Sequence, residues 1–143
     1  MDQSIHIITI ATHDLVAARR FYVGGLGWQP LFEEPGTIQF YQVAPSQVLG
    51  LFDAQAFNAD IDDGRDHTTP SGFTLAHNVD DADAVHRTVE RMERAGAKVL
   101  KHPQPSPVPG MLHAYVEDPV GVLWEVAHNP GWRVEDDGAV VFE

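Results

Sequence analysis

The sequence predicts an α+β fold built from two βαβββ modules, and three observations support this prediction. The chain has 143 residues with 43% hydrophobic content, which suits one compact domain with a sizeable core. Residues 36–52 and 110–126 align without gaps and share Gly, Tyr, Pro, Val and Leu at matching places, which indicates an internal repeat. Upstream of each repeat lie a β-rich run, a capped helical pattern and a glycine stop.

The first module is expected at about residues 4–53. Residues 4–11 form its β-rich run, and Asp14 stands where an N-cap belongs. Apolar residues then recur at helical spacing until a glycine-rich stretch ends the helix. A short strand at 28–32 and the hairpin at 36–52 complete the module.

The second module is expected at about residues 72–130 and repeats this order. A strand over 72–78 leads to a longer helix that Asp80 or Asp81 caps and Gly96 ends. A short strand and the second hairpin follow. The pattern therefore reads βαβββ twice.

Residues 54–71, between the modules, carry the polar stretches "DDGRD" and "TTP" and are expected to form an exposed linker. Together the two modules and this linker form a single domain over residues 1–143.

Composition narrows the function classes. The 21 acidic and 9 basic residues give a formal charge of −12, which argues against nucleic-acid and anionic-membrane partners and permits cationic ones. The chain has no cysteine, so we expect neither disulfides nor thiolate metal ligands, and a cytoplasmic location is the default. The N-terminus resembles neither a signal peptide nor a membrane-spanning helix.

Two segments, "HDLVAARRFYVGGLGW" and "YVEDPVGVLWEVAHNPGW", resemble the strand-to-helix segment and the closing hairpin of the vicinal oxygen chelate superfamily. The resemblance implies an open, cup-shaped mixed sheet with helices on the convex side and a small molecule in the cup. It also implies a homodimer. Members include glyoxalase I, extradiol dioxygenases, fosfomycin-modifying enzymes and bleomycin-binding resistance proteins, so the fold alone does not select an activity.

The resemblance also implies four metal positions, one on the first and one on the last strand of each module. Aligned on the repeat, these positions are Ile7, Leu51, Thr74 and Glu125. Three of them lack a ligand suited to zinc, nickel or iron, so we expect no metal and no other cofactor. Strand alternation places Glu125 on the cup face, away from the helices.

The position of His113 depends on the length of the second hairpin loop. A four-residue loop places Ala114 opposite Glu125 and turns His113 and Tyr115 toward the helices, and we expect this register. A five-residue loop would instead bring His113 into the cup beside Glu125.

Glu125 is the candidate catalytic residue. Its alternative role is a structural salt bridge with Arg19, Arg20 or a partner chain. The candidate substrate-binding residues share its predicted face: Ile7, Thr9, Phe40, Gln42, Leu51, Thr74, Asn78, Leu112 and Ala114.

Three functions remain open. The expected one is binding of a small amphipathic or cationic molecule without the usual metal centre. An alternative is a lyase, isomerase or dioxygenase acting on a small carbonyl or aromatic substrate, with Glu125 as base or metal ligand. The third is association with another protein, with the cup vestigial.

Overall fold

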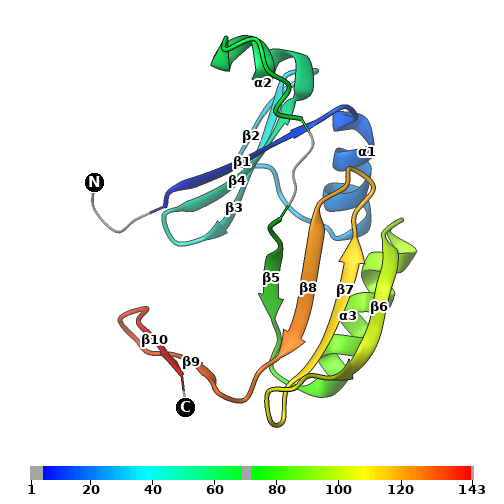
Figure 1. Ribbon diagram of the computed structural model, residues 1–143, viewed down its shortest axis with the longest axis vertical. Helices are drawn as coiled ribbons and strands as arrows, with labels where there is room; N and C mark the ends of the chain where they lie inside the picture. Colours follow the sequence, from blue (N-terminus) through cyan, green and yellow to red (C-terminus); the bar gives the residue numbers. More distant parts are fainter. Residues whose placement is uncertain (1–4, 69–71, 143) are drawn as a thin grey trace.

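The computed structural model describes residues 5–68 and 72–142, and it contains two four-stranded sheets. Figure 1 shows the helices beside these sheets. The sheets have the orders β1-β4-β3-β2 and β5-β8-β7-β6, so the two modules share one topology. In each, the first strand runs parallel to the last strand and the other neighbours are antiparallel. The predicted α+β fold with two βαβββ modules is confirmed, and the sheets are open.

The elements of the first half are β1 (Ile7–Thr12), α1 (Leu15–Arg19), the π-helical turn η1 (Arg20–Gly25), β2 (Phe32–Glu34), β3 (Ile38–Ala44), β4 (Gln47–Asp53) and α2 (Ala54–Ile61). Asp14 caps α1 as predicted, because its carboxylate accepts a hydrogen bond from the Ala17 N–H at 2.8 Å. The predicted strand at 28–32 lies further along the chain, since β2 begins only at Phe32.

The second half contains β5 (Leu75–Asn78), α3 (Ala82–Arg94), β6 (Lys98–Pro105), β7 (Leu112–Glu117), β8 (Leu123–His128), β9 (Trp132–Val134) and β10 (Val140–Phe142). Asp81 caps α3, which resolves the choice between Asp80 and Asp81. The β9–β10 hairpin lies beyond the predicted end of the module, away from the helices in Figure 1.

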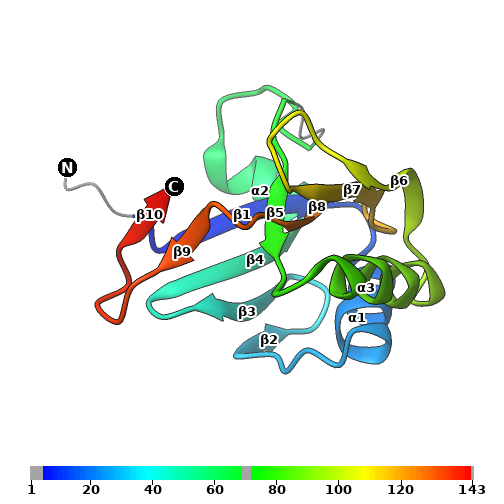
Figure 2. The same cartoon turned by 90° about the horizontal axis from the view of Figure 1, so that it is seen from below.

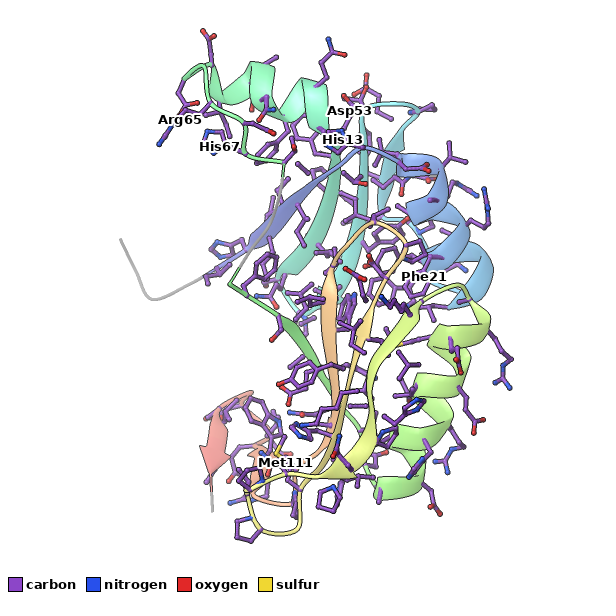
Figure 3. The ribbon with its side chains drawn as sticks, turned by 45° about the vertical axis from the view of Figure 1, so that its right-hand side comes forward. His13, Phe21, Asp53, Arg65, His67 and Met111 are labelled. Carbon is purple, nitrogen blue, oxygen red and sulfur yellow. The ribbon has the colours of Figure 1, made fainter. Side chains whose placement is uncertain are left out.

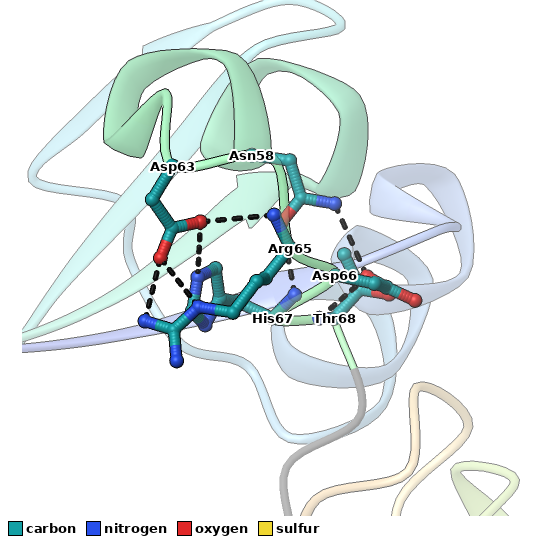
Figure 4. Close-up of polar contacts among 6 residues, drawn as sticks. All are labelled: Asn58, Asp63, Arg65, Asp66, His67 and Thr68. Atoms are coloured by element: carbon teal, nitrogen blue, oxygen red, sulfur yellow. Dashed lines mark hydrogen bonds and ion pairs between the residues drawn. The ribbon is translucent and has the colours of Figure 1, made fainter.

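The described part of the predicted linker, residues 54–68, is more ordered than a simple linker; residues 69–71 of that prediction lie outside the described residues. The first part of this segment is α2, which Asp53 caps through a 2.9 Å bond from the Ala56 N–H. Beyond the helix, the carboxylates of Asp63 and Asp66 accept hydrogen bonds from their neighbours (Figure 4). Figure 3 shows Arg65 and His67 of this turn beside α2. The prediction of a linker over 54–71 therefore missed a helix.

The two modules meet through their helices. Figure 2 shows α1 and α3 side by side, and Phe21, labelled in Figure 3, is fully buried where they meet. The Tyr22 hydroxyl donates to the Asp118 carboxylate at 2.5 Å and accepts from the Trp124 indole N–H at 3.2 Å. These buried bonds join η1 to the loop and strand of the second module. In the described residues, no helix is long and apolar enough to cross a membrane.

Candidate functional site

The strands β7 and β8 are joined by a five-residue loop over 118–122, so Tyr115 pairs with Glu125 and Ala114 pairs with Val126. The expected four-residue loop is therefore wrong, and the alternative register is the one observed. His113 and Tyr115 share the face of Glu125, opposite the face that packs on α3.

The loop is held open by its first residue. The Asp118 side chain accepts hydrogen bonds from the N–H groups of Val120, at 3.0 Å, and Val122, at 2.8 Å. These bonds draw Val122 into the turn, which adds one residue to the loop. Adding one residue moves every side chain on one strand to the other face relative to its partner strand.

Glu125 lies in a hydrogen-bonded network on this face of the second module. The Nδ1 atom of His113 lies 3.0 Å from Glu125 Oε1, and the Tyr115 hydroxyl donates to the same oxygen at 3.4 Å. On the other side of the imidazole, Lys101 Nζ lies 2.7 Å from His113 Nε2. His113 is 8% exposed and Glu125 keeps 20% of its side chain accessible, so the carboxylate can reach a ligand.

The donors and acceptors define the state of His113. A lysine ammonium can only donate, so Nε2 of His113 must accept from Lys101. The imidazole is then neutral with its proton on Nδ1, which donates to the Glu125 carboxylate. The neutral His113 ring therefore lies between the Lys101 ammonium and the Glu125 carboxylate, and its two hydrogen bonds fix its orientation.

Tyr115 lies beside His113 in this network and donates to Glu125. Partial burial raises the pKa of its phenol, and the negative charge of Glu125 and the hydrogen bond to it raise the pKa further. The Tyr115 hydroxyl therefore remains protonated and continues to donate at neutral pH. The alternative salt bridge of Glu125 with Arg19 does not form, because Arg19 pairs with Glu33 at 3.0 Å.

The first module presents a different, apolar face. Thr9 pairs with Gly50, and a Cβ at Gly50 would lie 2.8 Å from the Phe40 ring and 3.3 Å from Thr9 Oγ1. Thr9 and Phe40 therefore lie over Gly50, and a side chain there would displace the Phe40 ring. Ile7 and Gln42 share this face by strand alternation.

Three predicted lining residues lie on the opposite, helix-covered faces. Leu51 and Ala114 are fully buried in the core cluster, and Leu112 packs against it. Leu51 was predicted as the counterpart of Glu125. The register places Gly50 at that position instead. Gly50 of β4 pairs with Thr9 of β1, and in the second module Glu125 of β8 pairs with Ala76 at the matching place of β5.

Thr74 and Asn78 are each two residues from Ala76, so their side chains lie on the same face as Ala76. Ala76 pairs with Glu125, so this is also the face of Glu125. Thr74 and Asn78 are both exposed, and Thr74 also borders the cleft described below. Their predicted contact with a ligand stays a prediction.

The donors at the superfamily's metal positions do not fit a metal centre. The register gives Ile7, Gly50, Thr74 and Glu125 at these positions, with a single carboxylate among them. His113 adds an imidazole, but it is hydrogen-bonded on both nitrogens. Within residues 5–68 and 72–142, no group of three or more His, Cys, Asp or Glu side chains could hold an ion.

A cleft of about 960 Å³ lies between the modules, lined mostly from their other faces but also by Gln42, Thr74 and Ala76. It is lined by Ile8, Trp28, Gln29, Pro30, Leu31, Tyr41, Gln42, Val43, Ala44, Gln47, Leu49, Thr74, Leu75, Ala76, His77 and Trp124.

Comparison with known proteins agrees with this topology. The family model of the Glyoxalase/Bleomycin resistance protein/Dioxygenase superfamily matches residues 4–126. The chain belongs to this superfamily. No curated protein matches the chain.

Among solved structures, a glyoxalase-related enzyme from Fulvimarina pelagi is 38% identical, with 98% of each chain covered and a TM-score of 0.87. A lactoylglutathione lyase from Agrobacterium tumefaciens is 27% identical, with 90% of this chain and 95% of that chain covered and a TM-score of 0.69. The fosfomycin resistance protein FosX from Mesorhizobium loti is 18% identical over 90% of this chain and 94% of that chain, with a TM-score of 0.62, and shares the fold alone.

Proposed function

We propose that this superfamily member binds a small carbonyl compound at the Glu125 face of its second module and moves a proton there without the usual metal centre. The observation that carries the proposal is the network in which Lys101 and Glu125 hold a neutral His113 between them. The 38% identity to a glyoxalase-related enzyme adds support.

Glu125 is the base in this proposal. The hydrogen bonds from His113 and Tyr115 both reach Oε1. Among the described residues no other hydrogen bond to the Glu125 carboxylate is formed, so Oε2 is the oxygen that faces the substrate. Oε2 takes a proton from the carbon beside the carbonyl group, and the C–H electron pair moves to the carbonyl oxygen as an enolate. In an α-hydroxycarbonyl substrate, the proton of the adjacent hydroxyl moves to the enolate oxygen and the proton on Oε2 returns to the former carbonyl carbon. The hydroxyl oxygen becomes the new carbonyl oxygen, so the isomerisation balances.

The groups around Glu125 stabilise the charge that moves. The Lys101 ammonium gives one N–H to His113 and keeps further N–H donors, so it is the group that can stabilise the developing enolate oxygen; its Nζ lies 5.8 Å from the centre of the Tyr115 ring. His113 keeps the carboxylate in one orientation. This arrangement provides a base and a cationic donor on one face.

Deuterium exchange tests the proposal without knowledge of the full substrate. Dihydroxyacetone, and methylglyoxal with glutathione, would be incubated with protein in D₂O, and loss of the C–H signal beside the carbonyl would be followed by proton NMR. We expect exchange by the EDTA-treated wild type and at least a hundredfold slower exchange by Glu125→Gln. Glu117→Gln, two residues from Tyr115 on the same face of β7, is the matched control and should keep the wild-type rate.

Equal rates for Glu125→Gln and the wild type would overturn the role of the base, as would exchange that stops after EDTA treatment and returns with added metal. Lys101→Met removes both the positive charge of Lys101 and its hydrogen bond to His113 Nε2. The Nδ1–H bond to Glu125 remains, so we expect loss of the Lys101 bond to change the ¹⁵N shift of His113 Nε2. Unchanged shifts would contradict the proposed state of the ring.

A second function rests on a different observation. The first-module face carries Phe32 and Phe40 with ring centres 6.1 Å apart, and the chain has a formal charge of −12. These features suit binding of a small amphipathic or cationic molecule, with Glu125 as charge partner and pairing of two copies as a homodimer. Calorimetric titration with a cationic aromatic compound tests this, since Phe40→Ala and Glu125→Gln should each weaken binding.

A further inference from the structure

The cleft between the modules is lined by residues other than Glu125, His113, Tyr115 and Lys101. Leu49 of β4 and Trp124 of β8 line it from the two sheets. Trp124 and Glu125 are successive residues of one strand, so their side chains point to opposite faces. Glu125 is not among the described residues that line the cleft.

The aromatic wall of the cleft is fixed in place. The Trp28 ring lies 5.6 Å from Tyr41 and 6.0 Å from Trp124, in edge-to-face geometry with both. Behind them Tyr22 lies 4.8 Å from Trp28 and is bonded to Trp124 and to the Asp118 carboxylate. Rings already held by such contacts lose little freedom when a ligand binds, which favours stacking.

The polar groups of the cleft are neutral amides and an imidazole. Gln29, Gln42 and Gln47 lie around it, and His77 is its one titratable side chain apart from Tyr41. Among the described residues that line the cleft, none is Asp, Glu, Lys or Arg, although the chain carries a formal charge of −12. A charged ligand would lose its water without gaining an ionic partner, so the lining selects an uncharged one.

We infer that this cleft binds an uncharged, planar aromatic compound that stacks against the half-buried Trp28, which Trp124 holds in place, and hydrogen-bonds to the glutamine amides at its edge. The cleft volume of about 960 Å³ is within the range of small-molecule sites. The inference stands apart from the proposed function, because it uses the opposite face of β8.

Titration with the uncharged fluorescent probe N-phenyl-1-naphthylamine tests this inference. We expect a saturable rise in probe emission with one probe per chain and quenching of the emission from Trp28 and Trp124. Val43→Glu places a carboxylate on the cleft wall at a residue that is 42% exposed, so the fold should tolerate it. It should weaken probe binding by about tenfold or more, because the probe would then displace water from a charge.

Val108→Glu is the matched control, since Val108 is 48% exposed and lies outside the cleft lining. It should bind the probe like the wild type, and so should Glu125→Gln. The inference is overturned if binding does not saturate, or if Val43→Glu and Val108→Glu bind equally. It is also overturned if probe binding falls as protein concentration rises, because a second copy would then occupy the cleft.

Discussion

A close contact between the modules makes a sharp stability prediction. Gly25, at the end of η1, lies against Ala95, which follows α3. A Cβ at Gly25 would lie 2.2 Å from Ala95 Cβ and 3.0 Å from its Cα. Neither atom belongs to a side chain that can rotate away, so Gly25→Ala must push η1 and α3 apart. Overpacking of this kind costs about 1–3 kcal/mol, and we expect that loss in the free energy of unfolding.

The preceding residue provides the control. A Cβ at Gly24 has no atom within 4 Å, so Gly24→Ala should change stability by less than about 1 kcal/mol, and in the stabilising direction. Both substitutions remove a helical glycine, so the gain in helix propensity cancels when the two variants are compared. Urea denaturation followed by tryptophan fluorescence measures both. Equal midpoints for the two variants would refute the close approach of η1 and α3.

Two further predictions concern carboxylates. Burial raises the pKa of Asp118, so its contribution to stability is present below its ordinary pKa near 4 and is lost as pH rises through the folded value. Tyr22→Phe removes a bond that lowers this pKa, so its cost of about 2 kcal/mol in urea denaturation should be larger at pH 7 than at pH 4. A pH-independent cost would contradict this, and Tyr41→Phe, which loses a bond to a neutral amide, should show such a constant cost. In the turn after α2, hydrogen bonds lower the pKa of Asp66 to about 2, and the bond from the Thr68 hydroxyl is the first of these causes. The contribution of Asp66 to stability is therefore present above its ordinary pKa of 3.8 and is lost as pH falls from there through about 2. Thr68→Val should raise this pKa toward 3.8 in an NMR titration, and an unchanged value would show that the hydroxyl is not the cause.

The order of the elements could be predicted because it rests on local signals. Asp14 precedes an apolar pattern of helical period, and α1 begins at the next residue. The helix α2 was missed because its sequence, AQAFNADI, lacks a strong apolar stripe and leads into a polar turn. Its N-cap, Asp53, was a usable signal.

The candidate site was predicted only in part, because it depends on a register. Glu125 was found from its place in the closing hairpin, whereas Tyr115 and Lys101 were not identified as its neighbours. Lys101 pairs with Tyr115 across β6 and β7, beside register irregularities that sequence alternation does not reveal. The decisive feature was the Asp118 side chain, which sets the loop length through bonds to the backbone.

The two hairpins of this duplicated chain differ in their turns. In the first module Ala44 pairs with Gln47 across a tight turn, whereas in the second Glu117 pairs with Leu123. Insertion or deletion of a single residue at such a turn exchanges the inward and outward side chains of a whole strand. Duplicated halves can therefore acquire different chemistry without any replacement among the residues that line a pocket, and sequence alignments that ignore turn length will assign functional positions to the wrong residue.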